Sequence, residues 1–122
     1  MSVSNTFLAV FLGSKTSARS AAWAALPETQ RRAKEIEGIA AWKAWVEIHH
    51  AAIIPVGGPL GKTKRVTPRG VEDTSNGLAA FSVVRADSHE AAAKLFENHP
   101  HFTIFPGDGV EIMPVMPVPG GS

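Results

Sequence analysis

The chain has 122 residues, 44% hydrophobic and 19% charged, a balance that fits one globular domain and excludes wholesale disorder. Twelve Lys and Arg against eleven Asp and Glu give a formal net charge of +1, which disfavours nucleic-acid binding because little attraction for phosphates remains. The absence of Cys excludes disulfides, thiol nucleophiles and thiolate metal sites, and the absence of Tyr removes the phenol as a general acid.

No targeting or membrane segment is visible in the sequence. The longest early apolar run, Phe7–Leu12, has six residues, whereas a membrane span needs roughly 20. We therefore expect a cytoplasmic protein with no membrane partner. Residues 1–122 are expected to form a single domain, with 116–122 as a flexible C-terminal tail.

The first half of the chain reads as a strand followed by two helices. Phe7–Leu12 predicts a buried strand, and the Ala-rich segment Ala18–Leu26 predicts a helix. Pro27 is typical of the first position of a helix, and the next segment runs to about Ala51 without another Pro.

One face of this long helix is predicted to be apolar. At 100° per residue, one arc carries Ile36, Ile39, Trp42 and Val46, with His49 and His50 at its margins. Trp45 and Ile48 fall outside the arc. We therefore expect another helix or another chain to cover part of the back of the helix.

The second half predicts four strands and a helix. Ile53–Val56 reads as a strand that ends in a turn at Gly57-Gly58-Pro59, and Lys62–Thr67 reads as an edge strand. The segments 68–70 and 73–77 are expected to be loops.

Leu78–Val84 predicts a buried strand, after which Asp87 and Glu90 form a capping box for a helix over Ser88–Glu97. Pro100 prevents continuation of that helix, and the last strand is predicted over Val110–Val115. The order β-α(-α)-β-β-α-β predicts an α+β, ferredoxin-like split βαβ fold with a four-stranded antiparallel sheet.

Both faces of the predicted first strand are apolar: Phe7, Ala9 and Phe11 point one way, and Leu8, Val10 and Leu12 the other. Leaving five or six such side chains in water would forgo on the order of 10 kcal/mol, at roughly 1.5–3 kcal/mol each. We therefore expect a homodimer in which two sheets face each other. The alternative is that the segment 57–77 folds over the bare face.

An ordered set of segments resembles the YCII-related (DGPF) domain family: Phe7–Val10, Gly57–Leu60, Asp87–Ala92 with His99-Pro100, and Val110–Val115. The likeness extends from about residue 6 to 115. It implies a ferredoxin-like, dimeric α/β barrel that encloses a cavity. A His–Asp pair is proposed as catalytic in some members. Our rough alignment places Ala41 and His99 at those positions, so the pair does not carry over.

The histidines are the main candidates for chemistry, in the clusters His49-His50 and His99-Pro100-His101. His99 and His101 are predicted to lie just past a helix C-terminus, where the dipole favours the imidazolium. We assign His49 and His99 as candidate catalytic acid/base residues and His101 as a candidate ligand contact. Simple capping of the helix ends is the alternative for both clusters.

Arg85 and Arg65 are the candidate anchors for an anionic group of a ligand, and Asp108 is a further candidate ligand contact. No cofactor or metal is expected. The competing possibility is a zinc or iron site formed by His99 and His101 with Asp108 or a His of the long helix.

Together these features predict a homodimer that binds a small organic molecule, acting as a cofactor-free isomerase, lyase or oxygenase-like enzyme. The alternative function is a non-catalytic dimeric binding or assembly module.

Overall fold

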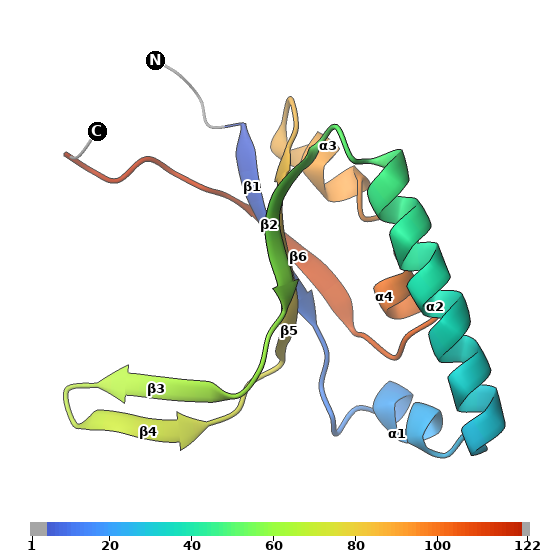
Figure 1. The fold of residues 1–122 in the computed structure, drawn as a ribbon. Coiled ribbons are helices and arrows are strands. Elements are labelled where there is room, and N and C mark those ends of the chain that lie inside the picture. Colours follow the sequence, from blue (N-terminus) through green and yellow to red (C-terminus); the bar gives the residue numbers. More distant parts are fainter. Residues whose placement is uncertain (1–4, 121–122) are drawn as a thin grey trace.

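A computed structural model describes residues 5–120 (Figure 1). The elements along the chain are β1 (Thr6–Leu12), α1 (Ala18–Ala24), α2 (Glu28–Ile48), β2 (Ile53–Pro59), β3 (Thr63–Thr67), β4 (Gly70–Thr74), β5 (Leu78–Arg85), α3 (His89–Lys94), α4 (Pro100–Thr103) and β6 (Gly109–Pro114).

The main sheet has four strands in the order β2-β5-β1-β6, and every neighbouring pair is antiparallel. The helices gather on one side of this sheet, as Figure 1 shows. This is the ferredoxin-like split βαβ arrangement, so the fold class predicted from the order of elements is confirmed.

The core lies between the sheet and the helices. Residues of β1 alternate, so that Phe7, Ala9 and Phe11 are at most 3% exposed, while the residues between them face the other side of the sheet and are only partly buried. Val84 of β5 pairs with Phe7 and is likewise buried. The uncovered sheet face therefore carries apolar side chains, as the sequence predicted.

The buried side of α2 differs from the predicted arc. Gly38 and Trp45 are the buried residues of this helix, whereas Ile36 is 69% exposed and Ile39 is 52% exposed. The reason is the packing of the segment after α3: the indole Nε1–H of Trp45 donates to the Leu95 carbonyl at 2.8 Å. A Cβ at Gly38 would lie 2.5 Å from the Phe105 ring, so only a residue without a side chain allows this approach.

The helices also begin and end at residues other than those predicted. Pro27 is the N-cap of α2 and not its first helical residue, and the helix stops at Ile48, before the expected end near Ala51. Ser88, not Asp87, caps α3, because the Ser88 hydroxyl accepts the Ala91 N–H at 3.0 Å. α3 is shorter than the predicted 88–97, and Asn98 then takes a left-handed conformation with φ of 59°.

Gly57-Gly58-Pro59 is not a turn but the second half of β2. The pairing of β2 with β5 shifts register between Ile54 and Gly57, and Gly57 has φ of 148°. A Cβ at Gly57 would meet the Phe81 carbonyl oxygen at 2.5 Å. Glycine thus lets the strand bulge and continue, where the sequence pattern suggested that it ended.

The segment 63–74 forms a hairpin of its own, in which β3 pairs with β4. The predicted strand over Lys62–Thr67 is confirmed as β3, but it belongs to this separate hairpin and not to the main sheet, whose edges are β2 and β6. The loops predicted over 68–70 and 73–77 are wrong in part, because β4 occupies Gly70–Thr74. The hairpin projects away from the body, toward the side of the sheet that carries no helix (Figure 1). It does not lie over the bare face, which argues against the alternative that 57–77 covers it.

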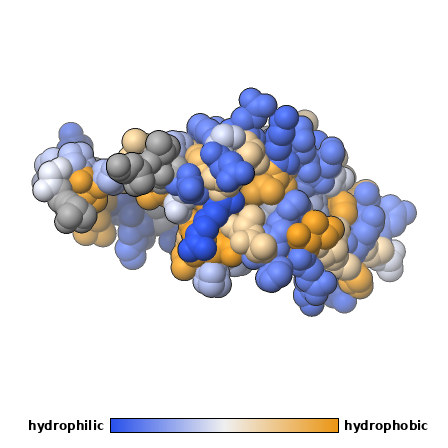
Figure 2. All heavy atoms as spheres, turned by 90° about the horizontal axis from the view of Figure 1, so that it is seen from above, coloured by the Kyte–Doolittle hydropathy of each residue, from blue (hydrophilic) through white to orange (hydrophobic). Residues whose placement is uncertain are grey.

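The surface is mixed, with hydrophobic patches exposed between hydrophilic residues (Figure 2). After β6 the chain continues as an exposed apolar segment in which Met116 is 69% and Val118 is 74% exposed. Residues 121 and 122 of the predicted tail lie outside the described residues. Within residues 5–120, no helix is both long and apolar enough to cross a membrane.

Candidate functional site

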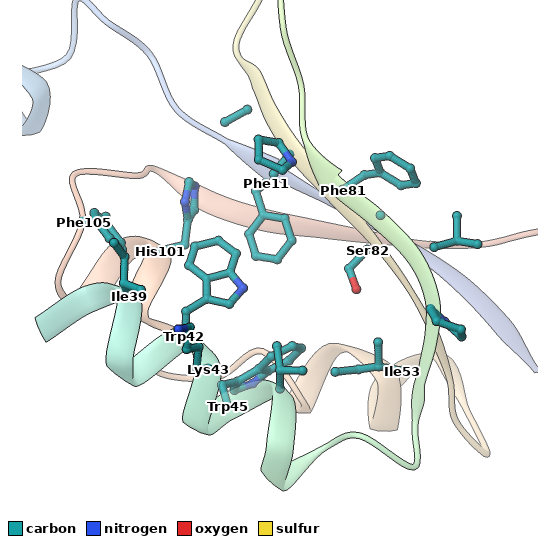
Figure 3. A pocket seen from close by; sticks show the side chains of 18 of the residues that line it. Phe11, Ile39, Trp42, Lys43, Trp45, Ile53, Phe81, Ser82, His101 and Phe105 are labelled. Atoms are coloured by element: carbon teal, nitrogen blue, oxygen red, sulfur yellow. The ribbon is translucent and has the colours of Figure 1, made fainter. Parts of the chain in front are cut away.

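A cavity of about 640 Å³ opens between α2 and the β2–β5 half of the sheet (Figure 3). Its size falls in the range typical of small-molecule sites. The lining comes from both layers and from the segment after α3: Phe11, Ile39, Trp42, Lys43, Trp45, Val46, residues 53–59, residues 79–82, His101 and Phe105.

Most of this lining is apolar, with a few polar groups at defined places. The Ser82 hydroxyl and the Trp42 indole nitrogen point into the space between the sheet and α2 (Figure 3), and neither has a hydrogen-bond partner among the described residues. Lys43 adds a cation, and no Asp or Glu belongs to the lining. The cavity therefore offers aromatic walls with hydrogen-bond donors.

His101 is the titratable base of the cavity. Its Nε2 lies 2.7 Å from the Leu12 carbonyl oxygen, and because a carbonyl only accepts, Nε2 carries the proton. In the neutral ring, the Nδ1 lone pair then has no hydrogen-bond partner among residues 5–120. His101 is 8% exposed, and burial lowers its pKa, opposed in part by the Leu12 hydrogen bond and Asp108. At neutral pH the imidazole is thus a neutral base.

The segment after α4 holds the His101 ring in place. Gly107 donates its N–H to the His101 carbonyl at 2.9 Å, and a Cβ at Gly107 would collide with the His101 ring. The Asp108 N–H donates to the same Leu12 carbonyl at 2.8 Å, and the Asp108 carboxylate accepts the Ser14 N–H at 2.8 Å. The end of β1 and the loop 107–108 are therefore tied together around His101.

His99 is fully buried, with 0% exposure. It is the N-cap of α4, and its Nδ1 accepts the His101 backbone N–H at 3.0 Å. Its ring centroid lies 4.5 Å from that of Trp42 and 4.7 Å from that of Trp45. Burial, with smaller contributions from His101 and His49, lowers the pKa of His99 to about 4.

The prediction that His99 and His101 are imidazolium groups at a helix C-terminus is therefore wrong. Both side chains are buried at the N-terminal end of α4, a short helix that sequence reasoning missed. Desolvation favours the neutral form of a buried imidazole, which outweighs any attraction to a helix end.

The candidate catalytic pair does not meet in the cavity. His49 is the C-cap of α2, half-buried, with its ring centroid 5.1 Å from that of Trp45. Neither His49 nor His99 lines the cavity, whereas His101, predicted as a ligand contact, does.

The remaining predicted ligand contacts lie outside this cavity. Arg65 is on the hairpin, 3.8 Å from the Glu72 carboxylate and 3.2 Å from the Thr74 hydroxyl. Arg85 is exposed at the end of β5, and Asp108 is exposed in the loop before β6. The structure does not bring these three side chains to the cavity.

Sequence reasoning missed Ser82, Trp42 and Lys43 as cavity groups. A signal existed for Ser82, which is the one hydroxyl among apolar residues of a strand, on the same face as the buried Val84. Trp42 was assigned to packing, and nothing in its spacing distinguishes a cavity wall from a core residue.

No group of three or more His, Asp or Glu side chains within residues 5–120 is arranged to hold a metal ion. The two histidines that the sequence offered as metal ligands already use ring nitrogens in hydrogen bonds. His101 Nε2 donates to the Leu12 carbonyl, and His99 Nδ1 accepts the His101 N–H. His99 and His101 therefore do not share a metal-ligating geometry with Asp108.

No family model and no curated protein matches the sequence. Among solved structures, the fold is similar to 5-chloro-2-hydroxyhydroquinone dehydrochlorinase (TftG) from Burkholderia phenoliruptrix AC1100, in its complex with 2,5-dihydroxybenzoquinone. The TM-score is 0.53 with 19% identity, over 91% of this chain and 93% of that one. At this identity the likeness shows the fold alone, and it is consistent with the α+β, ferredoxin-like architecture expected from the sequence.

Proposed function

We propose that this chain is a YCII-related protein that binds a small planar organic molecule between α2 and the sheet, with His101 as acid/base. The observation that carries this proposal is the neutral imidazole of His101, which lines a mostly apolar cavity: its Nε2–H is fixed on Leu12, and its Nδ1 has no hydrogen-bond partner among the described residues. Such a base, held in one orientation beside a ligand, is suited to moving a single proton.

The lining indicates the class of ligand. Phe11, Trp42 and Trp45 provide flat aromatic walls, which favour a ring. The Trp42 N–H, the Ser82 hydroxyl and the Lys43 ammonium can all donate to an oxygen. We therefore infer an aromatic or quinoid ring with a hydroxyl or carbonyl oxygen, a class to which the ligand of TftG also belongs. His101 Nδ1 takes a proton from such a ligand and returns it, as an isomerase or lyase requires.

Binding of 2,5-dihydroxybenzoquinone, followed by titration calorimetry, tests this proposal. We expect His101→Ala to weaken binding about two- to ten-fold, since one hydrogen bond to a neutral group contributes roughly 0.5–1.5 kcal/mol. Gly107→Ala, which forces the His101 ring off Leu12, should weaken binding in the same direction. Gly109→Ala is the matched control, because a Cβ there meets nothing within 4 Å. Unchanged affinity in folded His101→Ala would refute the assignment of the base.

A binding protein without turnover is the second candidate function. The lack of a carboxylate in the lining favours it, because no carboxyl group is present there to exchange a proton in concert with His101. Turnover assays on ligands that bind distinguish the two: a ligand that is bound but never converted supports the non-catalytic module.

We also propose that two copies pair through the bare sheet face. Leu8 and Val10 of β1 and their partners Val83 and Phe81 of β5 lie on that face and are only partly buried. The β3–β4 hairpin and the segment after β6 both project toward the same side of the sheet (Figure 1), where they would flank a second copy.

Sedimentation equilibrium tests the dimer. The unaltered chain is expected at twice its mass of 12.9 kDa, and Val10→Lys should shift it toward the monomer because it places a charge at the centre of the apolar face. Ile48→Lys, at a 75% exposed position of α2, is the control and should remain dimeric. A monomeric unaltered chain at micromolar concentration would contradict the proposal.

A further inference from the structure

We infer that His99 is a positioning residue, whose Nδ1 caps α4 and thereby holds the His101 imidazole at the cavity. It would act on a ligand only through His101. The inference rests on the proposed function, in which His101 is the base. It replaces the catalytic role that the sequence suggested for His99 with a structural reason for a buried imidazole.

The first support is the network around α4. His99 Nδ1 accepts the His101 N–H at 3.0 Å, and the His99 carbonyl accepts the Thr103 N–H and the Thr103 hydroxyl, both at 3.1 Å. His99 therefore accepts hydrogen bonds from donors at both ends of α4, a helix of four residues. The backbone from which the His101 ring projects depends directly on these bonds.

The second support is what surrounds the ring. His99 contacts Trp42, Trp45 and Phe11, with centroid distances of 4.5, 4.7 and 5.1 Å, and all three also line the cavity. A ring is needed to fill this space. His99 therefore connects three walls of the cavity with the residue proposed as its base.

The third support is the unequal use of the two ring nitrogens. His99 Nε2 is buried without a hydrogen-bond partner within the described residues, which carries a free-energy cost. Phenylalanine would fill the same space without that cost but offers no acceptor. Asn is a good N-cap but has no ring. Of these residue types, only His both fills the space between the indoles and accepts the His101 N–H.

Two variants separate these properties. His99→Phe keeps a ring and removes the acceptor, whereas His99→Asn keeps an acceptor and removes the ring. The readouts are the free energy of unfolding at pH 7.5, the ¹⁵N chemical shifts of the His101 imidazole, which report its tautomer and pKa, and the affinity for 2,5-dihydroxybenzoquinone.

We expect His99→Phe to stay folded while His101 loses its single Nε2–H tautomer and its pKa rises toward the ordinary value. Ligand affinity should then fall, by at most the roughly two- to ten-fold expected for His101→Ala, because His99 acts on the ligand only through His101. His99→Asn should have a lower free energy of unfolding but keep the Nε2–H tautomer and the lowered pKa of His101. If His99 served packing alone, the free energy of unfolding and the tautomer and pKa of His101 would change together in each variant.

Retention of the His101 tautomer and pKa in folded His99→Phe would overturn the inference, and so would their loss in folded His99→Asn. Should the Asn variant not fold, the Phe variant decides alone. The His101 spectrum requires no ligand, so it tests His99 even if the unaltered protein binds no probe. Absence of binding would instead count against the proposed function.

Discussion

Acidification from pH 7 to pH 4 is expected to destabilise the protein by about 3 kcal/mol through His99 alone. The folded-state pKa of this fully buried imidazole is lowered from 6.5 to about 4, and each pKa unit corresponds to about 1.36 kcal/mol. Between these values the unfolded chain binds a proton that the folded chain excludes. Stability is therefore lost progressively as the pH falls from about 6.5 to about 4, and is unaffected by His99 above that window.

The environment of His99 opposes its protonation from every side. The rings of Trp42, Trp45 and Phe11 surround it, and the titratable groups that act on it are His101 and His49, whose protonated forms would repel a second positive charge and so lower the pKa of His99. The pKa of His101 is also lowered by burial, so that this residue adds to the loss in the same direction.

Urea unfolding at a series of pH values measures the effect, with His99→Phe as the comparison because it removes the titrating group and keeps a ring. The difference in unfolding free energy between the two proteins should change by about 3 kcal/mol from His99 between pH 7 and pH 4, and by a further amount in the same direction from His101, whose lowered pKa is also lost in His99→Phe. Carboxylates that titrate in the same range contribute equally to both and cancel. Parallel pH profiles for the two proteins would show that His99 is not buried in its neutral form.

Phe11→Ala is expected to cause the largest loss of stability of any single substitution near the cavity, about 3–5 kcal/mol. Phe11 is 1% exposed and its ring contacts the rings of Trp42, Phe96, His99 and His101, with centroid distances of 5.1, 5.8, 5.1 and 5.3 Å. Truncation leaves a void that these four rings fill only in part, because the two imidazoles are held by hydrogen bonds and all four rings are held by their backbone positions.

Thermal or urea unfolding measures the loss, with Ile48→Ala as the matched control. Ile48 is 75% exposed on α2, so its truncation should change stability by no more than about 0.5 kcal/mol. A cost below about 1 kcal/mol for Phe11→Ala would mean that the layer between β1 and α2 is not packed as described.

The sequence predicted the main strands because their signals are local. Alternation and apolar runs identified β1, β5 and β6, and the order of elements then specified the ferredoxin-like topology. The β3–β4 hairpin was missed because its second strand, Gly70–Thr74, is polar and pairs only with its neighbour. The turn signal of Gly57-Gly58 was misleading because glycine serves a bulge as readily as a turn.

For the site, the sequence identified the histidines as the residues to examine, but not their roles. Their charge state depends on burial, and burial at 99–101 depends on α2, distant in sequence, which places Trp42 and Trp45 against this segment. Periodicity placed Trp45 outside the apolar arc, since it measures the helix alone and not what packs on it.

What the sequence determined by itself was an α+β fold with apolar residues on both faces of its first strand. Only the tertiary structure decided that His101 lines the cavity while His99 is enclosed behind it, two residues apart. The physical reason is that α4 turns the chain between them, so that neighbours in sequence experience different surroundings.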